Sequence, residues 1–149
     1  MSKNFYPVSK QEMGDFLEAQ GFRPMSLDNC NELVWGKVVD FDGRKLSMRV
    51  YSAINPDGHS RPAGKDAIRV SLFIRTDDGI MCCSGDKRVH RVPTWATNLQ
   101  KRIDNWRENV GPACPACGAP TKERKGKFGK FFGCSTWRLT KCNGKSQAA

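Results

Sequence analysis

Four of the seven cysteines lie near the end of the chain at spacings suited to binding one metal ion. Cys114 and Cys117 are separated by two residues and followed by Gly118, so both sulfur atoms can face the same ion while the glycine permits a tight turn. The 16 residues before Cys134 are enough for a hairpin that returns the chain to this first pair. With Cys142 as the fourth ligand, the coordination is closed. We therefore predict one structural Zn²⁺ ion that catalyses nothing.

Aromatic and basic side chains surround the second half of this cysteine group. Unpaired bases stack on aromatic rings and cations hold phosphates, so the combination is typical of proteins that bind single-stranded nucleic acid. Alternatively, some rings form the small core of the segment, because the neighbours Phe131 and Phe132 must point to opposite sides of a strand. The candidate nucleic-acid contacts here are Arg124, Lys127, Phe128, Lys130, Phe131, Phe132, Trp137 and Arg138.

The element Cys114-Pro115-x-Cys117-Gly118 is followed by the basic and aromatic run of residues 124–135. Together they resemble the C-terminal zinc ribbons of bacterial type IA DNA topoisomerases, over residues 112 to 144 or so. The resemblance implies a β-ribbon that binds single-stranded DNA through aromatic and basic side chains. It also implies that the ribbon accompanies another domain and performs no chemistry itself.

The chain departs from this family after Cys134. Seven residues precede Cys142, more than the family usually has, and Trp137 stands near the place where the family commonly has a Tyr-Pro pair. The rest of the chain does not resemble the catalytic body of a topoisomerase, and 149 residues are too few to hold one. Topoisomerase activity is therefore not predicted.

The net charge of +10 is unevenly distributed. Residues 1–110 hold 17 basic and 14 acidic residues, whereas residues 111–149 hold 8 and 1, a net charge of +7. Four thiolates on one Zn²⁺ carry two negative charges, which leaves about +5 in the metal-loaded segment. Such a field attracts polyanions, of which nucleic acid is the commonest. A basic tail that only improves solubility is the alternative.

Neither a membrane span nor a targeting segment is predicted. The longest apolar runs are only a few residues, far short of the roughly 20 that a membrane helix needs. The N-terminus has charged residues in place of an apolar core with a cleavage site. We therefore expect a cytoplasmic protein that does not interact with membranes.

Residues 1–109 are predicted to form an α+β domain ahead of the ribbon at residues 110–149. Ser9 and Glu12 form a capping box that starts a helix, which ends near Gln20. Asp42 and Gly43 suit the two-residue turn of a β-hairpin. We expect an antiparallel sheet of four or five strands with two flanking helices. The strands are predicted at 33–41, 44–54, 67–76 and 80–84, with an optional fifth at 87–92. The second helix is predicted from Trp95 to about Arg107, and its apolar residues, Trp95, Leu99, Ile103 and Trp106, lie on one stripe.

Alternation along the segments 44–54 and 67–76 separates two faces of the predicted sheet. One face is apolar, and we expect the helices to cover it. The other carries Arg49, Tyr51, Arg69, Phe73 and Arg75, which predicts a second platform for unpaired bases. A solvated face or a dimer interface fits the same residues. Further basic residues are candidates for flanking phosphate contacts, namely His59, Arg61, Lys65, Lys87, Arg88, His90 and Arg91.

The main hypothesis is a non-catalytic nucleic-acid-binding protein, with single-stranded DNA favoured over RNA. One alternative is a nuclease or other DNA-processing enzyme that the ribbon delivers to its substrate. Its magnesium ligands would be acidic residues such as Asp40, Asp42, Asp57 or Asp66, although none of these forms a pair at recognisable catalytic spacing. Another alternative is an adaptor that binds a polymerase or another replication or transcription protein. The sequence assigns no role to Cys30, Cys82, Cys83, His59 and His90.

Overall fold

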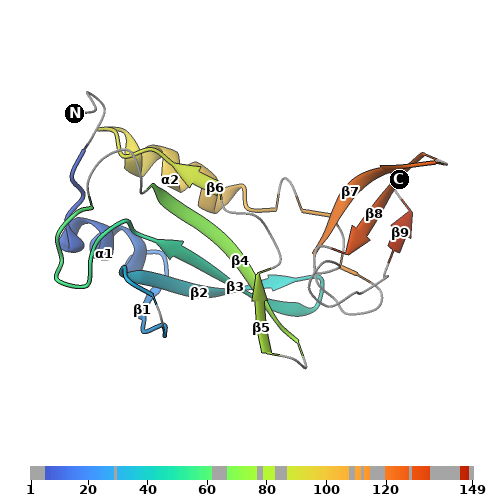
Figure 1. The fold of residues 1–149 in the computed structure, drawn as a ribbon, viewed down its shortest axis with the longest axis horizontal. Helices are drawn as coiled ribbons and strands as arrows, with labels where there is room; N and C mark the ends of the chain where they lie inside the picture. The colour runs from blue at the N-terminus through green and yellow to red at the C-terminus, as the bar shows by residue number, and fades with distance from the viewer. Residues whose placement is uncertain are drawn as a thin grey trace. The chain divides into compact units, whose positions relative to one another are not determined.

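The computed structural model describes residues 6–28, 30–61, 67–76, 79–82, 87–107, 110–111, 113–114, 120–127, 129–134 and 145–147 (Figure 1). Its contacts divide the chain into two units. The first comprises Met1–Lys37, Met48–Ser71 and Asp86–Asp104, and the second comprises Val38–Ser47, Leu72–Gly85 and Asn105–Ala149. The elements are α1 (Lys10–Glu18), β1 (Arg23–Met25), β2 (Val34–Phe41), β3 (Arg44–Tyr51), β4 (Ile68–Thr76), β5 (Gly79–Cys82), β6 (Lys87–Val89), α2 (Trp95–Asp104), β7 (Thr121–Gly126), β8 (Gly129–Cys134) and β9 (Lys145–Gln147).

Strands β1 to β6 form one sheet of order β1-β2-β3-β4-β5, in which β6 also pairs with β4. The antiparallel sheet with two helices is therefore as predicted, and the basic segment at 87–92 does contain a strand. Strand β5 pairs with the Phe73–Thr76 end of β4, whereas β6 pairs with its Ile68–Val70 end. The nine residues of β4 are enough to hold both short strands, so β6 returns to β4 instead of extending the sheet beyond β5.

Helix α1 begins and ends at the predicted signals. The Ser9 hydroxyl accepts a hydrogen bond from the backbone N–H of Glu12 at 3.1 Å, which satisfies one of the donors left open by the first turn. At the other end, Gly21 has a φ of +93°, and the N–H of Phe22 donates to the carbonyl of Leu17 at 3.2 Å. The left-handed glycine stops the helix and turns the chain into β1.

The β2–β3 hairpin is closed by the predicted turn. Asp42 and Gly43 have φ values of +46° and +82°, the left-handed conformation that a two-residue turn between twisted strands requires. Strand β1 was not predicted, because three residues that include Pro24 carry too little pattern to indicate a strand.

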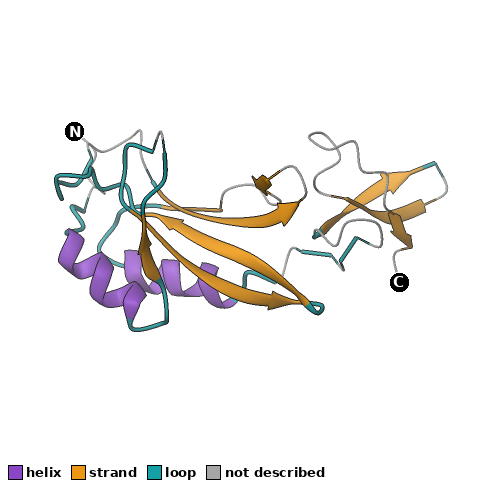
Figure 2. Cartoon of the chain, turned by 90° about the horizontal axis from the view of Figure 1, so that it is seen from below, coloured by secondary structure: helices purple, strands orange, loops and turns teal. Residues whose placement is uncertain are grey.

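In the first unit, the two helices pack against one face of the sheet (Figure 2). Trp95, Leu99 and Ile103 are buried, which confirms three members of the predicted apolar stripe. The fourth, Trp106, is half-buried and lies beyond the helix, which ends at Asp104 and not near Arg107. The ring of Phe16 on α1 meets that of Trp95 edge to face, with centroids 5.5 Å apart. The core of this unit is completed by Val8, Met13, Leu17, Phe22, Trp35, Met48, Val50, Ile54, Ile68 and Val70.

The second unit has its own apolar contact and its own small sheet. Phe41, at the end of β2, is fully buried, and its ring lies 6.2 Å from that of Trp106. Strands β7, β8 and β9 form an antiparallel sheet in that order. Within the described ranges, both helices fall short of the length and hydrophobicity needed to cross a bilayer.

Candidate metal site and nucleic-acid interface

The C-terminal sheet contains the hairpin predicted between Cys117 and Cys134. Strands β7 and β8 pair from Thr121↔Cys134 to Gly126↔Gly129. Gly129 has a φ of +115°, a conformation that residues with a Cβ rarely adopt, so a glycine is needed where the chain reverses. Strand β9 then pairs with β8 through Phe131↔Gln147 and Gly133↔Lys145. A three-stranded ribbon therefore follows the first cysteine pair.

Two of the four predicted zinc ligands lie beside the same end of β7. Ala113, immediately before Cys114, forms an isolated bridge with Pro120, and the neighbouring Thr121 is the partner of Cys134. The Cys114 side chain is buried, with 2% of its surface exposed. Cys117 and Cys142 lie outside the described residues. Among the residues that are described, no group of three or more His, Cys, Asp or Glu is placed to hold a metal ion.

The predicted nucleic-acid contacts of this region are distributed along the hairpin. Arg124 on β7 is the direct partner of Phe131 on β8, and Lys125 is the partner of Lys130. Phe132 lies opposite Glu123. Lys127, in the turn, is exposed. Phe128, Trp137 and Arg138 fall outside the described residues.

On the main sheet, the structure brings together Tyr51 of β3 and Arg69 of β4. The guanidinium carbon of Arg69 lies 4.5 Å from the centroid of the Tyr51 ring. The same guanidinium forms an ion pair with Glu32. In the second unit, Phe73 is half-buried and Arg75 is exposed. An aromatic and basic pair therefore exists on the predicted face within the first unit.

Arg49 differs from the expectation that this set of residues is exposed. Only 8% of its surface is accessible. Alternation along a strand decides which face a side chain points to, but it does not decide whether neighbouring side chains cover it. Arg49 therefore lies on the predicted face of the sheet, but its side chain is too little exposed for a direct contact with nucleic acid.

Two of the arginines considered as flanking phosphate contacts instead hold the loop after β3. Arg91 is 6% exposed and donates to the carbonyl of Arg61 at 2.6 Å. Arg61 in turn donates to the side-chain oxygens of Asn55, at 3.1 Å, and Asn31, at 2.6 Å. These bonds satisfy polar groups of the loop. Sequence patterns could not reveal the bonds of Arg61 to Asn31 and of Arg91 to Arg61, because each joins residues that are 30 positions apart. The other candidate phosphate contacts that are described, His59, Lys87, Arg88 and His90, are exposed. Lys65 lies outside the described residues.

Part of the chain is similar to a bacterial DNA topoisomerase. DNA topoisomerase 1 of Alkalihalophilus pseudofirmus is 43% identical over 49 residues, which are 33% of this chain and 6% of that enzyme. The comparison supports a topoisomerase-related region within the chain. Because the chain spans such a small share of the topoisomerase, the activity of that enzyme is not assigned to it. No family model and no solved structure matches the chain.

The aspartates considered as magnesium ligands are engaged separately. Asp40 forms an ion pair with Lys45 across the β2–β3 hairpin. Asp57 accepts a hydrogen bond from the backbone N–H of His59 at 2.9 Å, and this bond lowers the pKa of the Asp57 carboxyl. Asp42 accepts from Arg107, and Asp66 lies outside the described residues. Asp40, Asp42 and Asp57 therefore take part in turns and ion pairs.

Asp42 joins the β2–β3 turn to the segment that leads into Cys114. One of its oxygens accepts from the Arg107 guanidinium at 2.7 Å, and the other accepts from the backbone N–H of Ala113 at 3.1 Å. The N–H of Gly111 donates to the carbonyl of Thr121 at 2.8 Å. The residues before Cys114 are thus fixed from both sides within the second unit.

Replacing Asp42 with glycine is expected to loosen this segment while preserving the turn. Glycine tolerates the positive φ at position 42 but lacks both oxygens. Because the bond is partly exposed and involves a charged acceptor, its loss is worth about 1 kcal/mol. Amide hydrogen exchange at Ala113 should therefore accelerate roughly fivefold. The Gly111 amide is the internal control and should keep its rate. Equal protection at Ala113 in both proteins would show that Asp42 does not hold it.

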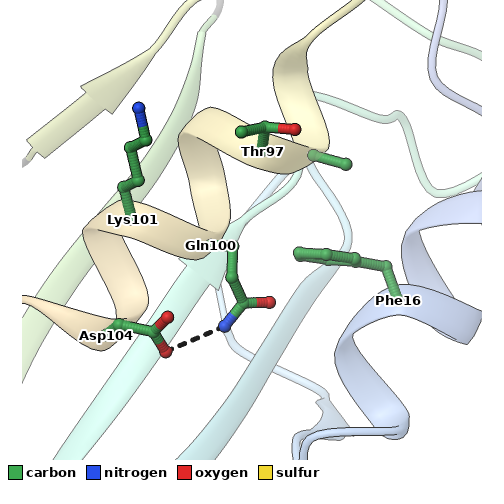
Figure 3. A pocket seen from close by; sticks show the side chains of 6 residues that line it. Phe16, Thr97, Gln100, Lys101 and Asp104 are labelled. Atoms are coloured by element: carbon green, nitrogen blue, oxygen red, sulfur yellow. Dashed lines mark hydrogen bonds between the residues drawn. The ribbon is translucent and has the colours of Figure 1, made fainter.

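A shallow groove of about 380 Å³ separates α1 from α2 on the outside of the first unit (Figure 3). Phe16 and Gln100 lie on opposite sides of it, and the Gln100 amide donates to the carboxylate of Asp104 at 2.9 Å (Figure 3). The same amide donates to the side-chain oxygen of Gln20 at 2.9 Å. None of the residues predicted to contact metal or nucleic acid lines this groove. Its lining consists of Phe16, Ala96, Thr97, Gln100, Lys101 and Asp104.

Proposed function

We propose that the protein is a non-catalytic nucleic-acid-binding protein whose ligand is single-stranded DNA in preference to RNA. Its main support is the β7–β8 hairpin, which places basic and aromatic positions such as Arg124 and Phe131 directly opposite each other. This hairpin belongs to a segment of 39 residues with a net charge of +7. The similarity of part of the chain to a DNA topoisomerase gives independent support for a nucleic-acid ligand.

Four cysteines would hold one zinc ion at the base of this hairpin, namely Cys114, Cys117, Cys134 and Cys142. Thiolates are preferred ligands of Zn²⁺, and four of them leave no open position for water. The arrangement fits what is described, since Cys114 is buried and both Cys114 and Cys134 adjoin the start of β7. When bound, the ion supplies folding energy only. The chain itself supplies the nucleic-acid contacts.

Binding then divides between two kinds of side chain. Lysines and arginines of the hairpin, such as Lys127, hold phosphates and release the counterions that surround them. Aromatic residues of the ribbon and Tyr51 of the main sheet stack against unpaired bases. Neither kind needs a particular base, because every base has a stacking face and every nucleotide a phosphate. The expected ligand is therefore a single strand of any sequence.

Titration of the full-length protein with a fluorescent single strand tests this function. Each phosphate held contributes about 0.7 to the slope of log affinity against log salt concentration, so four contacts imply a roughly 50-fold loss between 50 and 200 mM salt. Duplex DNA and RNA of the same sequence should bind more weakly. An affinity that does not change with salt, a preference for duplex, or cleavage of the strand with magnesium would contradict the proposal.

A pair of lysine substitutions locates the charge contacts. Lys127→Gln should reduce the salt slope by about 0.7, because it removes one phosphate contact of the ribbon. Lys10→Gln removes a charge from α1 that is also exposed and should leave the slope unchanged. Equal slopes for the two variants would mean that the ribbon does not contact phosphate at this position.

A further inference from the structure

Strand β6 carries exposed cations at the border of the main sheet. Of its three residues, Lys87 and Arg88 are exposed and Val89 is buried, with 3% of its surface accessible. The strand pairs with β4, where Val89 lies opposite the fully buried Ile68 and the next pair is Arg88 with Arg69. Residues directly opposite each other share a face of the sheet, and consecutive residues alternate between faces. The two arginines therefore lie on the other face from the buried pair.

The buried pair identifies the face that the helices cover. Helices α1 and α2 pack against one face of the sheet in the first unit, and α2 contacts β6 (Figure 2). Ile68 and Val89 belong to the core beneath them. Arg88 accordingly lies on the face away from the helices, here called the open face. Arg69 contacts the Tyr51 ring on this same face, so the open face carries one aromatic ring and two guanidinium groups on three strands.

The charges of the two opposed arginines are not equally compensated. Like charges directly opposite each other on a sheet are destabilising. Arg69 forms an ion pair with Glu32, whose side chain is only 4% exposed, so a buried carboxylate already offsets one of the two charges. The ion pairs found among the described residues do not include Arg88. The excess positive charge of the opposed pair is therefore located on the exposed Arg88.

An exposed guanidinium with no carboxylate partner is suited to binding phosphate. Its planar group can donate two parallel N–H bonds to phosphate oxygens. Lys87, the preceding residue, is also exposed and adds to the local positive potential. Cations on a border strand can instead serve only to prevent pairing with other molecules, and in that role they have no effect on nucleic-acid binding. The two roles therefore differ in what removal of the charge does to binding.

We propose that Arg88 is a phosphate-binding residue on the open face of the first unit, separate from the phosphate contacts of the ribbon. The inference rests on the proposed function and extends it, because it gives the main sheet a charge contact in addition to stacking at Tyr51. It assigns no ligand to Arg69, whose charge compensates Glu32. Arg88 belongs to the first unit and Lys127 to the second. A single strand long enough to reach both is therefore held by charge at two places.

Arg88→Gln tests this contact in the full-length protein, with the fluorescent single strand as ligand. Removal of one phosphate contact should lower the slope of log affinity against log salt concentration by about 0.7. For a protein that makes four contacts, the loss of affinity between about 50 and 200 mM salt should then be roughly 20-fold instead of roughly 50-fold. Arg88→Lys retains the charge and should keep a slope close to that of the wild type. Because Arg88 is exposed, both variants should keep the melting temperature of the wild type.

Arg102→Gln is the matched control for Arg88→Gln. Arg102 is an exposed arginine of α2, so its removal changes the net charge equally but on the covered side of the sheet, and the slope should not change. Equal reductions of the slope in both variants would overturn the proposal, because they would show an effect of overall charge. A wild-type slope in Arg88→Gln, with more aggregation at high concentration, would also overturn it and identify Arg88 as a charge that protects the border strand.

A double variant, Arg88→Gln with Lys127→Gln, separates this site from the ribbon. Two independent contacts with one strand predict that the slope falls by about 1.4, twice the effect of a single contact. A fall of only about 0.7 would mean that the two residues do not hold the strand together and would overturn the separate site. Absence of binding by the wild type would refute the proposed function, and this site with it. Binding with an unchanged slope in Arg88→Gln would refute the site alone.

Discussion

Removal of zinc is expected to unfold the C-terminal sheet and to weaken single-strand binding at least tenfold. A segment of 39 residues is too small to be stable from apolar burial alone, and such segments usually depend on a metal or on disulfides. Structural zinc sites supply about 10–16 kcal/mol of apparent binding free energy, far more than three short strands provide. Elemental analysis should find one zinc ion per chain, and a chelator should eliminate the amide signals of β7–β9.

Substitution of single cysteines tests which of them hold the zinc ion. Cys114→Ser removes one proposed ligand and should reproduce the effect of the chelator. Cys30→Ser is the matched control, because Cys30 belongs to the first unit and its thiol donates a weak hydrogen bond to the carbonyl of Glu32, which a serine hydroxyl can also donate. Purified protein without metal, or a Cys114→Ser variant that keeps its zinc and its binding, would contradict the proposed site.

Truncation of Phe41 to alanine is expected to reduce the free energy of unfolding by about 3–5 kcal/mol. The ring is fully buried between Trp106 and Arg107, whose guanidinium carbon lies 4.2 Å from its centroid. Alanine would leave a cavity and remove the surface on which both neighbours rest. Since domains of this size are stable by only about 5–15 kcal/mol, the loss is a large fraction of the total. Urea denaturation followed by tryptophan fluorescence measures it.

Val38→Ala is the matched control for Phe41→Ala. Val38 lies on the same strand but is 66% exposed, so its truncation should change the unfolding free energy by less than about 0.5 kcal/mol. If both variants lose similar stability, burial of Phe41 is not what stabilises this part of the second unit.

The sequence correctly predicted those elements that are determined by interactions between residues close together in the chain. The Ser9 cap, the left-handed Gly21, the Asp42-Gly43 turn and the stripe from Trp95 to Ile103 depend on residues close together in sequence, and each is confirmed. The β7–β8 hairpin was predicted for the same reason, from the glycines and the distance between cysteines.

Features that depend on distant partners were missed. No sequence pattern indicated a role for Glu32, because its ion pair is with Arg69, 37 residues away. Arg61 and Arg91 resembled exposed phosphate contacts until their bonds to the loop and to each other were seen. The pairing of β6 with β4 likewise depends on how the whole sheet is arranged, and the alternation of apolar and polar residues along one segment does not specify its partner strand.

The strands that border the main sheet also bear on how the protein behaves when concentrated. Strand β1 has three residues including a proline, and β5 and β6 have four and three. Border strands this short offer other molecules little continuous backbone for intermolecular β-pairing, which disfavours growth into fibrillar aggregates.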